Sequence, residues 1–128
     1  MRAELEDIMS QVTIDTLEKL AFMFAFSDES GEDPPRDSTV AGSVSFTGPF
    51  SGTLIVMISI EVLQELAANM LGLDDGEEAT QDHQFDALKE TLNVICGNLL
   101  PAIAGDEVVF DIGVPMVLPA DQEMTKGA

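Results

Sequence analysis

The residues with the clearest chemical potential lie in one stretch of the chain, between positions 82 and 105. Asp86, Glu90, Asn93 and Gly97 follow one another there at intervals of three or four residues, the spacing of one face of an α-helix. Together they offer carboxylate and amide groups along a single line. We call these four residues the polar row and take them as the candidate site.

The same stretch carries an apolar face. Five residues follow the 3-4-3-4 spacing of a buried helix face: Phe85, Leu88, Leu92, Ile95 and Leu99. The two faces lie roughly 150° apart at about 100° per residue, so a core on the apolar side leaves the polar row facing outward. The pattern predicts one long helix over residues 82–105, with Asp82 as its N-cap. Pro101 is expected to kink this helix or to end it early.

Other common kinds of active site lack their residues in this chain. One His and one Cys cannot supply the several ligands of a zinc site. His83 and Cys96 would lie about 20 Å apart along one helix at 1.5 Å per residue, which excludes a Cys–His nucleophilic pair. The motifs GxxxxGKS and GxSxG are absent. We therefore expect no metal or cofactor bound by this chain, and we expect Cys96 to belong to the helix packing.

The composition restricts the partners. A chain of 128 residues with 45% hydrophobic content is the size of a single domain with a buried core. Five basic and 24 acidic residues give a formal charge of -19, which repels nucleic acid and anionic membranes, so neither is an expected partner. Solubility, or adaptation to a particular ionic environment, is the simplest interpretation of so acidic a surface. The apolar run at residues 20–26 is too short to span a bilayer and follows no basic segment, so we expect a cytoplasmic protein.

Other stretches predict the elements that position the long helix. Residues 3–25 carry apolar side chains at largely helical spacing and predict a first helix. From residue 39 the period changes to two, and Gly48-Pro49 turns the chain, so residues 39–60 predict an antiparallel hairpin. Its second half, residues 52–60, is apolar on both sides of the pleat, as in a central strand.

A second helix follows this hairpin directly, and Gly72 is expected to end it. Its predicted inward residues are Val62, Leu63, Leu66, Ala67 and Met70. After the long helix, residues 108–112 and 114–118 are apolar and predict two further strands separated by Gly113. Five methionines are expected to fill the core: Met9, Met23, Met57, Met70 and Met116.

Three remaining stretches are expected to lie outside the regular elements. Residues 27–38 are acidic and predict an exposed loop, residues 73–81 form a second acidic linker, and the tail at residues 120–128 is expected to be loose. Because the predicted strands come in adjacent pairs, we expect an α+β fold in which helices cover a mainly antiparallel sheet.

The polar row also resembles a known signature. Asp86-x-x-x-Glu90-x-x-Asn93, followed further along by Pro115, is similar to the motif of the CheC/CheX chemotaxis phosphatases. The hairpin SFTGPFSGTLIV and the order of elements resemble that family too, over most of the chain from about Val40. The resemblance implies that residues 1–128 form a single CheX-like domain. It also implies that the protein removes the phosphoryl group from the phospho-aspartate of a CheY-type response-regulator receiver domain.

This resemblance gives each residue of the polar row a role. Asn93 would orient the attacking water, because an amide both donates and accepts hydrogen bonds. Glu90 would pair with a lysine beside the phosphorylation site of the receiver, and Asp86 would lie at the edge of the same contact. Gly97 would let the backbone of the partner come close. The Mg²⁺ ion of such a reaction would belong to the receiver rather than to this chain.

The resemblance also implies one site per chain. Two-site members of the family carry the motif in both halves, whereas the corresponding Ile14-x-x-x-Glu18-x-x-Ala21 keeps the acid and lacks the amide. CheX-like proteins pair through their sheets, so a homodimer is implied as well.

Several alternatives remain open at this stage. The protein could be a catalytically weak binding module that docks on a receiver or on another chemotaxis signalling protein, or a purely structural acidic domain. Asp86 and Glu90 could be ordinary solvated charges. Glu61 and Gln64 repeat the spacing of the motif on the second helix, but an acid is common in a first helical turn. Catalysis is favoured if Glu90 and Asn93 point outward together, and a binding module is favoured if Asn93 bonds within the fold.

Overall fold

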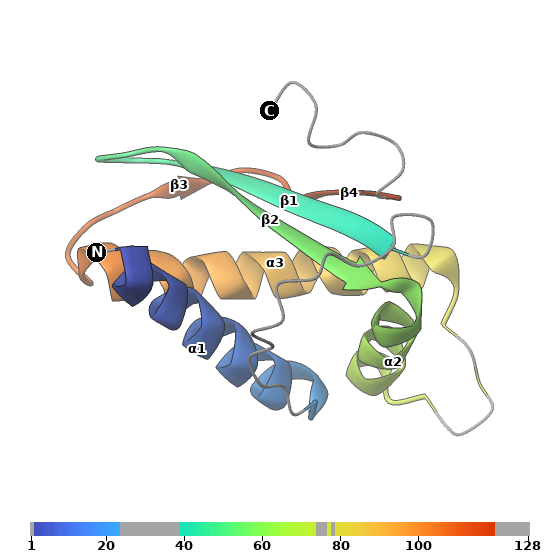
Figure 1. Cartoon of the computed structure of the whole chain (residues 1–128). Helices are drawn as coiled ribbons and strands as arrows, with labels where there is room; N and C mark the ends of the chain where they lie inside the picture. The colour runs from blue at the N-terminus through green and yellow to red at the C-terminus, as the bar shows by residue number, and fades with distance from the viewer. Residues whose placement is uncertain (1, 24–38, 74–76, 78, 120–128) are drawn as a thin grey trace.

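The computed structural model of the chain describes residues 2–23, 39–73, 77 and 79–119. The elements within these ranges are α1 (Arg2–Ala21), β1 (Thr39–Thr47), β2 (Gly52–Ser59), α2 (Ile60–Leu71), α3 (Gln81–Ala104), β3 (Asp111–Ile112) and β4 (Met116–Pro119). The strands form one antiparallel sheet, and the helices lie on one side of it (Figure 1). The predicted α+β fold is therefore confirmed. The predicted loop at 27–38 and the tail at 120–128 lie outside the described residues, and the assignment of residues 1–128 to one domain stays a prediction.

The centre of the sheet is β1 rather than β2. Over residues 39–46 β1 pairs with β2, from Thr39 opposite Ser59 to Phe46 opposite Gly52, and its other edge pairs with β3 and β4. The predicted hairpin is confirmed, but the prediction of a central strand at residues 52–60 is wrong, since β2 has one neighbour among the described strands. Its outward side chains are apolar yet partly exposed, so an apolar pattern on both faces did not mean burial on both faces.

The segments β3 and β4 pair with β1 and not with each other, so they form no second hairpin. The register changes from Phe46 opposite Ile112 to Ser43 opposite Met116, which places one extra residue on the β3–β4 side, as in a β-bulge. The Gly113 N–H donates to the Ser45 carbonyl oxygen at 2.8 Å within this interval. Pro115 has no N–H for the ladder, which explains why β4 begins at Met116 and not at residue 114 as predicted; β3 is also shorter than predicted, since residues 108–110 do not belong to it.

The core lies between the sheet and α3. The predicted apolar face of α3 is confirmed: Leu88, Leu92, Ile95 and Leu99 are at most 5% exposed, and Phe85 is half-buried. Gly42 of β1 allows the helix to come close, because a Cβ atom at this position would lie 2.6 Å from Leu92 Cδ1. Cys96 is fully buried in the same cluster, as expected.

The ends of the helices show how local sequence sets their limits. Helix α3 begins at Gln81, and its N-cap is Thr80 rather than Asp82: the Thr80 hydroxyl accepts a hydrogen bond from the His83 N–H at 3.2 Å. Pro101 does not end the helix, which continues to Ala104. Gly72 ends α2 in a left-handed conformation (φ 69°), as predicted.

Helix α1 ends four residues earlier than predicted. It stops at Ala21, and Phe22 adopts a positive φ of 56°. Residues 24 and 25, the last of the predicted helix, lie outside the described residues.

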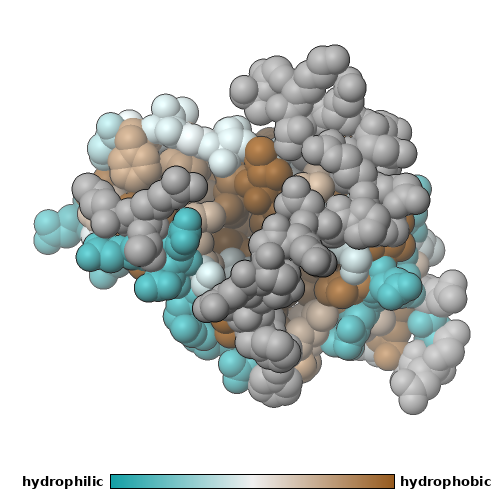
Figure 2. Space-filling view, viewed as in Figure 1, coloured by the Kyte–Doolittle hydropathy of each residue, from teal (hydrophilic) through white to brown (hydrophobic). Residues whose placement is uncertain are grey.

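Large apolar side chains also remain at the surface, where brown apolar areas lie among hydrophilic ones (Figure 2). Val62 is 39% exposed, so its predicted inward position on α2 is wrong, while Leu63, Leu66 and Ala67 are buried as predicted. Three methionines predicted for the core are exposed: Met9, Met57 and Met116. The last two belong to the outer side of the sheet, which no described helix covers.

Candidate functional site

All four members of the polar row are exposed on α3. They lie on the side of the helix turned away from its apolar face, as the spacing predicted. The side chains of Glu90 and Asn93 are one helical turn apart, and neither makes a hydrogen bond or ion pair with another described residue. The pair therefore presents an uncommitted carboxylate and an uncommitted amide to any molecule that approaches this face.

The N-terminal half of α3 is fixed by α2. Ala87 packs into a small cluster with Ala67 and Ala79. The Thr91 hydroxyl donates to the Ala87 carbonyl oxygen at 2.8 Å and lies 3.6 Å from Met70 Sδ. These contacts hold the helix on the side next to the polar row, so the site stands on a packed element rather than on a loop.

Glu90 and Asp86 also line a hollow of about 160 Å³ between α2 and α3. Its remaining walls are Met70, Leu71, His83 and Ala87. Leu71 is 48% exposed there, so the two carboxylates border an apolar surface. A partner that bound the polar row at this end would meet charge and apolar contact together.

Cys96 lies three residues beyond Asn93 on α3 but is fully buried. Burial raises the pKa of its thiol above the ordinary value. A protonated thiol without access to solvent is a poor nucleophile, so Cys96 contributes to packing and not to the chemistry of the polar row.

The two competing occurrences of the motif differ from the polar row in their surroundings. Gln64 accepts a hydrogen bond from the Gln84 side-chain amide, which also donates to the Ala79 carbonyl oxygen at 3.0 Å. The side-chain amide of Gln64 is thus already hydrogen-bonded within the fold. Glu61 is an acid in the first turn of α2, as interpreted from the sequence. On α1, Glu18 is exposed while Ala21 is fully buried.

The described part of the chain shows neither a metal-binding cluster nor a membrane-spanning helix. No group of three or more His, Cys, Asp or Glu side chains there is arranged to hold a metal ion. None of the helices described combines the length and the apolar character needed to cross a membrane.

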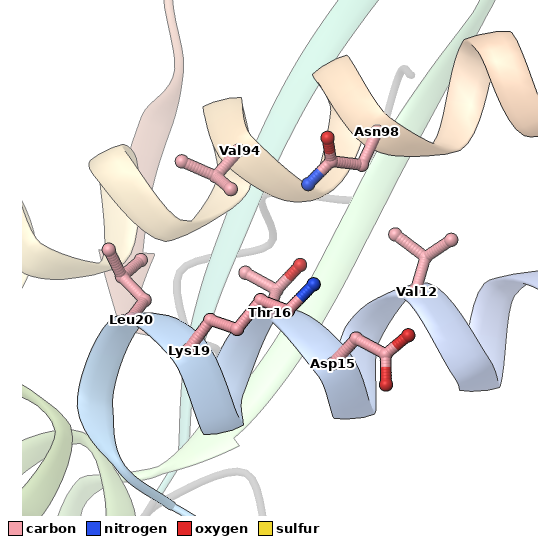
Figure 3. A pocket seen from close by; sticks show the side chains of 7 residues that line it. All are labelled: Val12, Asp15, Thr16, Lys19, Leu20, Val94 and Asn98. Carbon is pink, nitrogen blue, oxygen red and sulfur yellow. The ribbon is translucent and has the colours of Figure 1, made fainter.

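Sequence reasoning did not identify a second hollow, which lies between α1 and α3. Its volume is about 270 Å³, and Val94 and Asn98 of α3 form one side of it (Figure 3). These two residues continue a line of four-residue steps that begins at Glu90. The available signal was Asn98, because asparagine is a poor helix former in mid-helix, and this argument applies to it as it does to Asn93.

Comparison with known proteins assigns the chain to a protein family. Residues 40–126, more than half of the chain and including the whole polar row, match the family model described as chemotaxis phosphatase CheX. No protein with a curated description matches the chain.

Several solved structures share the fold. A chemotaxis protein CheX from Desulfovibrio desulfuricans is 20% identical, with a TM-score of 0.71 over 91% of this chain and 77% of the other. The CheX–CheY–BeF3–Mg complex from Borrelia burgdorferi gives 20% identity and a TM-score of 0.72 over 95% and 80%. The CheX protein from Vibrio vulnificus gives 19% identity and a TM-score of 0.73 over 93% and 76%. At these identities the likeness concerns the fold, and the family match carries the assignment: this chain belongs to the CheX family of chemotaxis phosphatases.

Proposed function

We propose that this protein hydrolyses the phospho-aspartate of a response-regulator receiver domain of the CheY type, with Glu90 and Asn93 as the catalytic pair. One observation carries the proposal. Both side chains are exposed one turn apart on a packed helix, and neither is bonded within the described residues. The structure from Borrelia burgdorferi supports the choice of partner, because it is a CheX–CheY complex.

The reaction is an in-line attack of water on phosphorus. The bond between phosphorus and the aspartyl oxygen breaks, which releases inorganic phosphate and restores the carboxylate of the receiver. A catalyst of such a step gains most from positioning and from charge stabilisation. The Asn93 amide accepts a hydrogen bond from the water and donates one to its surroundings, so it holds the water in line with the phosphorus atom. Mg²⁺, expected in the receiver, would neutralise charge on the phosphoryl oxygens.

The other members of the polar row fix the approach of the partner. Glu90 pairs with a lysine beside the phosphorylation site of the receiver, and Asp86 lies at the edge of this contact. A Cβ atom on Gly97 would meet no atom within 4 Å, so packing among the described residues does not require a glycine there. A close approach of the partner backbone gives the glycine a purpose.

The proposal is tested by the lifetime of the phospho-aspartate on receivers from the same cell, with and without this protein. Asn93→Ala removes the positioning group and little ground-state contact, so turnover should fall by about 100-fold or more while binding is largely spared. The matched control is Asn69→Ala, which removes an exposed asparagine from α2. Unchanged turnover with Asn93→Ala would exclude the assigned role.

Glu90→Ala tests the proposed pairing with the receiver. This variant should bind the phosphorylated receiver more weakly, since it leaves the partner lysine without its carboxylate. Glu61→Ala serves as control, because it removes one exposed carboxylate from α2. Equal affinity of wild type and Glu90→Ala would exclude the lysine pair.

The same assay distinguishes a phosphatase from the alternative, a catalytically weak binding module. Its signature is binding to a receiver without acceleration of phosphate release in any receiver tested. The outward position of Asn93, without hydrogen bonds to other described residues, favours catalysis.

The homodimer implied by the resemblance to CheX is part of the proposal. The exposed apolar side chains of Ile55, Met57 and Met116 on the outer side of the sheet support a pairing surface there. Sedimentation equilibrium measures the mass directly, and a monomer at all concentrations would exclude the dimer.

A further inference from the structure

The hollow between α1 and α3 has features of a binding pocket. Its volume is about 270 Å³, and Val12 and Leu20 of α1 face Val94 of α3 across it (Figure 3). Pockets for drug-sized ligands begin at about 300 Å³, so this one suits a smaller molecule. The apolar walls favour a ligand with a short hydrocarbon part.

The side chain of Thr16 is a second indication that the pocket binds a ligand. It lines this pocket and is only 3% exposed, and its hydroxyl has no hydrogen-bond partner among the described residues. A buried hydroxyl without a partner lowers the stability of a fold, because its bonds to water are lost and not replaced. A ligand that accepted a hydrogen bond from Thr16 would remove this cost.

Three of the four polar residues that line the pocket can donate hydrogen bonds. In Figure 3 the hydroxyl of Thr16 and the amide nitrogen of Asn98 point into the space between the two helices, and the exposed side chain of Lys19 runs along α1 so that its ammonium ends beside Thr16 in this view. All three groups can donate hydrogen bonds. The carboxylate of Asp15 also belongs to the lining, but it points away from α3 and accepts a hydrogen bond from Gln11 Nε2 at 2.9 Å. The pocket therefore has three groups that can donate hydrogen bonds, and its one ammonium belongs to the exposed Lys19.

We propose that this pocket binds a small aliphatic carboxylate. Lys19, Thr16 and Asn98 donate to its two oxygens, and its hydrocarbon chain packs against the apolar walls. A carboxylate offers lone pairs for several donors at once, and its bond to an ammonium is charge-assisted. The formal charge of -19 opposes anions in general, so the apolar contact is what selects this ligand over a bare anion such as phosphate.

The test uses the whole chain, labelled with ¹⁵N, and sodium butyrate as the probe at constant ionic strength. Butyrate should produce saturable shifts of the backbone amide signals around Thr16, Lys19 and Asn98. Butyramide has nearly the same shape without the charge, and inorganic phosphate has the charge without the hydrocarbon chain. Both should bind at least about tenfold more weakly, since each lacks one of the two contributions. Equal shifts with butyramide, or no saturable shifts with butyrate, would overturn the proposal.

Two variants assign the binding to named groups. Lys19→Met keeps the length of an exposed side chain and removes its charge, and should weaken butyrate about tenfold or more. Lys89→Met removes the same charge from α3, outside the pocket lining, and should leave the affinity close to that of wild type. Equal butyrate affinity in wild type and Lys19→Met would contradict the proposal that the ligand binds in this pocket.

Thr16→Val replaces the hydroxyl with a methyl group of similar size. Without ligand this variant should melt at or above the temperature of wild type, since a polar group without a partner is lost. Its butyrate affinity should nevertheless fall severalfold. A more stable variant with unchanged affinity would mean that the hydroxyl does not contact the ligand. No receiver takes part in these measurements, so the result is independent of the proposed phosphatase activity.

Discussion

Gly97→Ala separates the stability of the fold from the proposed use of the polar row. Gly97 lies in the interior of α3, is exposed, and has open space where a Cβ atom would be. Alanine in an exposed helix interior is more favourable than glycine by about 0.5–1 kcal/mol, because the unfolded chain loses less freedom on folding. For a chain of this size the gain corresponds to a rise in melting temperature of roughly 2–6 °C.

The same methyl group should impair contact with the receiver. If the partner backbone packs against Gly97, a Cβ atom is inserted into a closed interface, and overpacking costs about 1–3 kcal/mol. At 1.4 kcal/mol per factor of ten, the dissociation constant should rise by about 5- to 150-fold. The variant should thus be a more stable protein and a weaker partner.

Urea denaturation and titration with a phosphorylated receiver measure the two effects on one sample. Gly105→Ala is the informative control: this glycine also has open space around it, but its φ of +94° strains any other residue, so the same substitution should destabilise. Gain of stability with unchanged receiver affinity would refute the close approach at Gly97. Loss of stability would refute the account of the helix itself.

Two further predictions concern the core beneath the site. Gly42→Ala should lower the free energy of unfolding by about 1–3 kcal/mol, because the new Cβ atom would lie 2.6 Å from Leu92 Cδ1 and 3.1 Å from Leu88 Cδ2; a urea curve matching that of wild type would mean that these side chains rotate away without cost. For Cys96, the raised pKa in the folded state means that the fold retains the thiol proton to higher pH than the unfolded chain does. The contribution of the Cys96 thiol to the free energy of unfolding is therefore complete below its pKa in the unfolded chain, about 8.5. It is lost as the pH rises toward the pKa of the thiol in the folded protein. The difference in unfolding free energy between wild type and Cys96→Ala should shrink over that range, and parallel pH profiles would contradict it.

The long helix could be predicted because its two faces are encoded in one continuous segment. The apolar positions Leu88, Leu92 and Ile95 repeat with the period of the helix itself, and the outward position of Glu90 and Asn93 follows by geometry. The first hairpin was equally local, since a turn joins two stretches of alternating pattern. Each of these features needed no knowledge of distant parts of the chain.

The features that could not be predicted depend on neighbours. Residues 52–59 are apolar on both faces whether or not a second strand pairs with them, so the pattern could not distinguish an edge strand from a central one. The N-cap of α3 was misplaced by two residues because Thr80 and Asp82 are both good N-caps, and only the bond to the His83 N–H identifies which of them caps the helix. The segments β3 and β4 found their partner in β1, far away in the sequence.

The pocket between α1 and α3 depends on the angle at which the two helices cross, and the periodicity of the sequence does not determine this angle. Helix α1 runs at an angle to α3 (Figure 1), and helices that cross at an angle are in contact over a limited length. Apolar residues of α1 outside the contact stay exposed, as Leu5 and Met9 do at 40% and 37%, while Thr16 is buried although its side chain is polar. A substitution that changed the crossing of α1 would therefore alter the pocket at Asn98 while leaving the polar row in place, because α3, which carries the row, is also held by α2 and by the sheet.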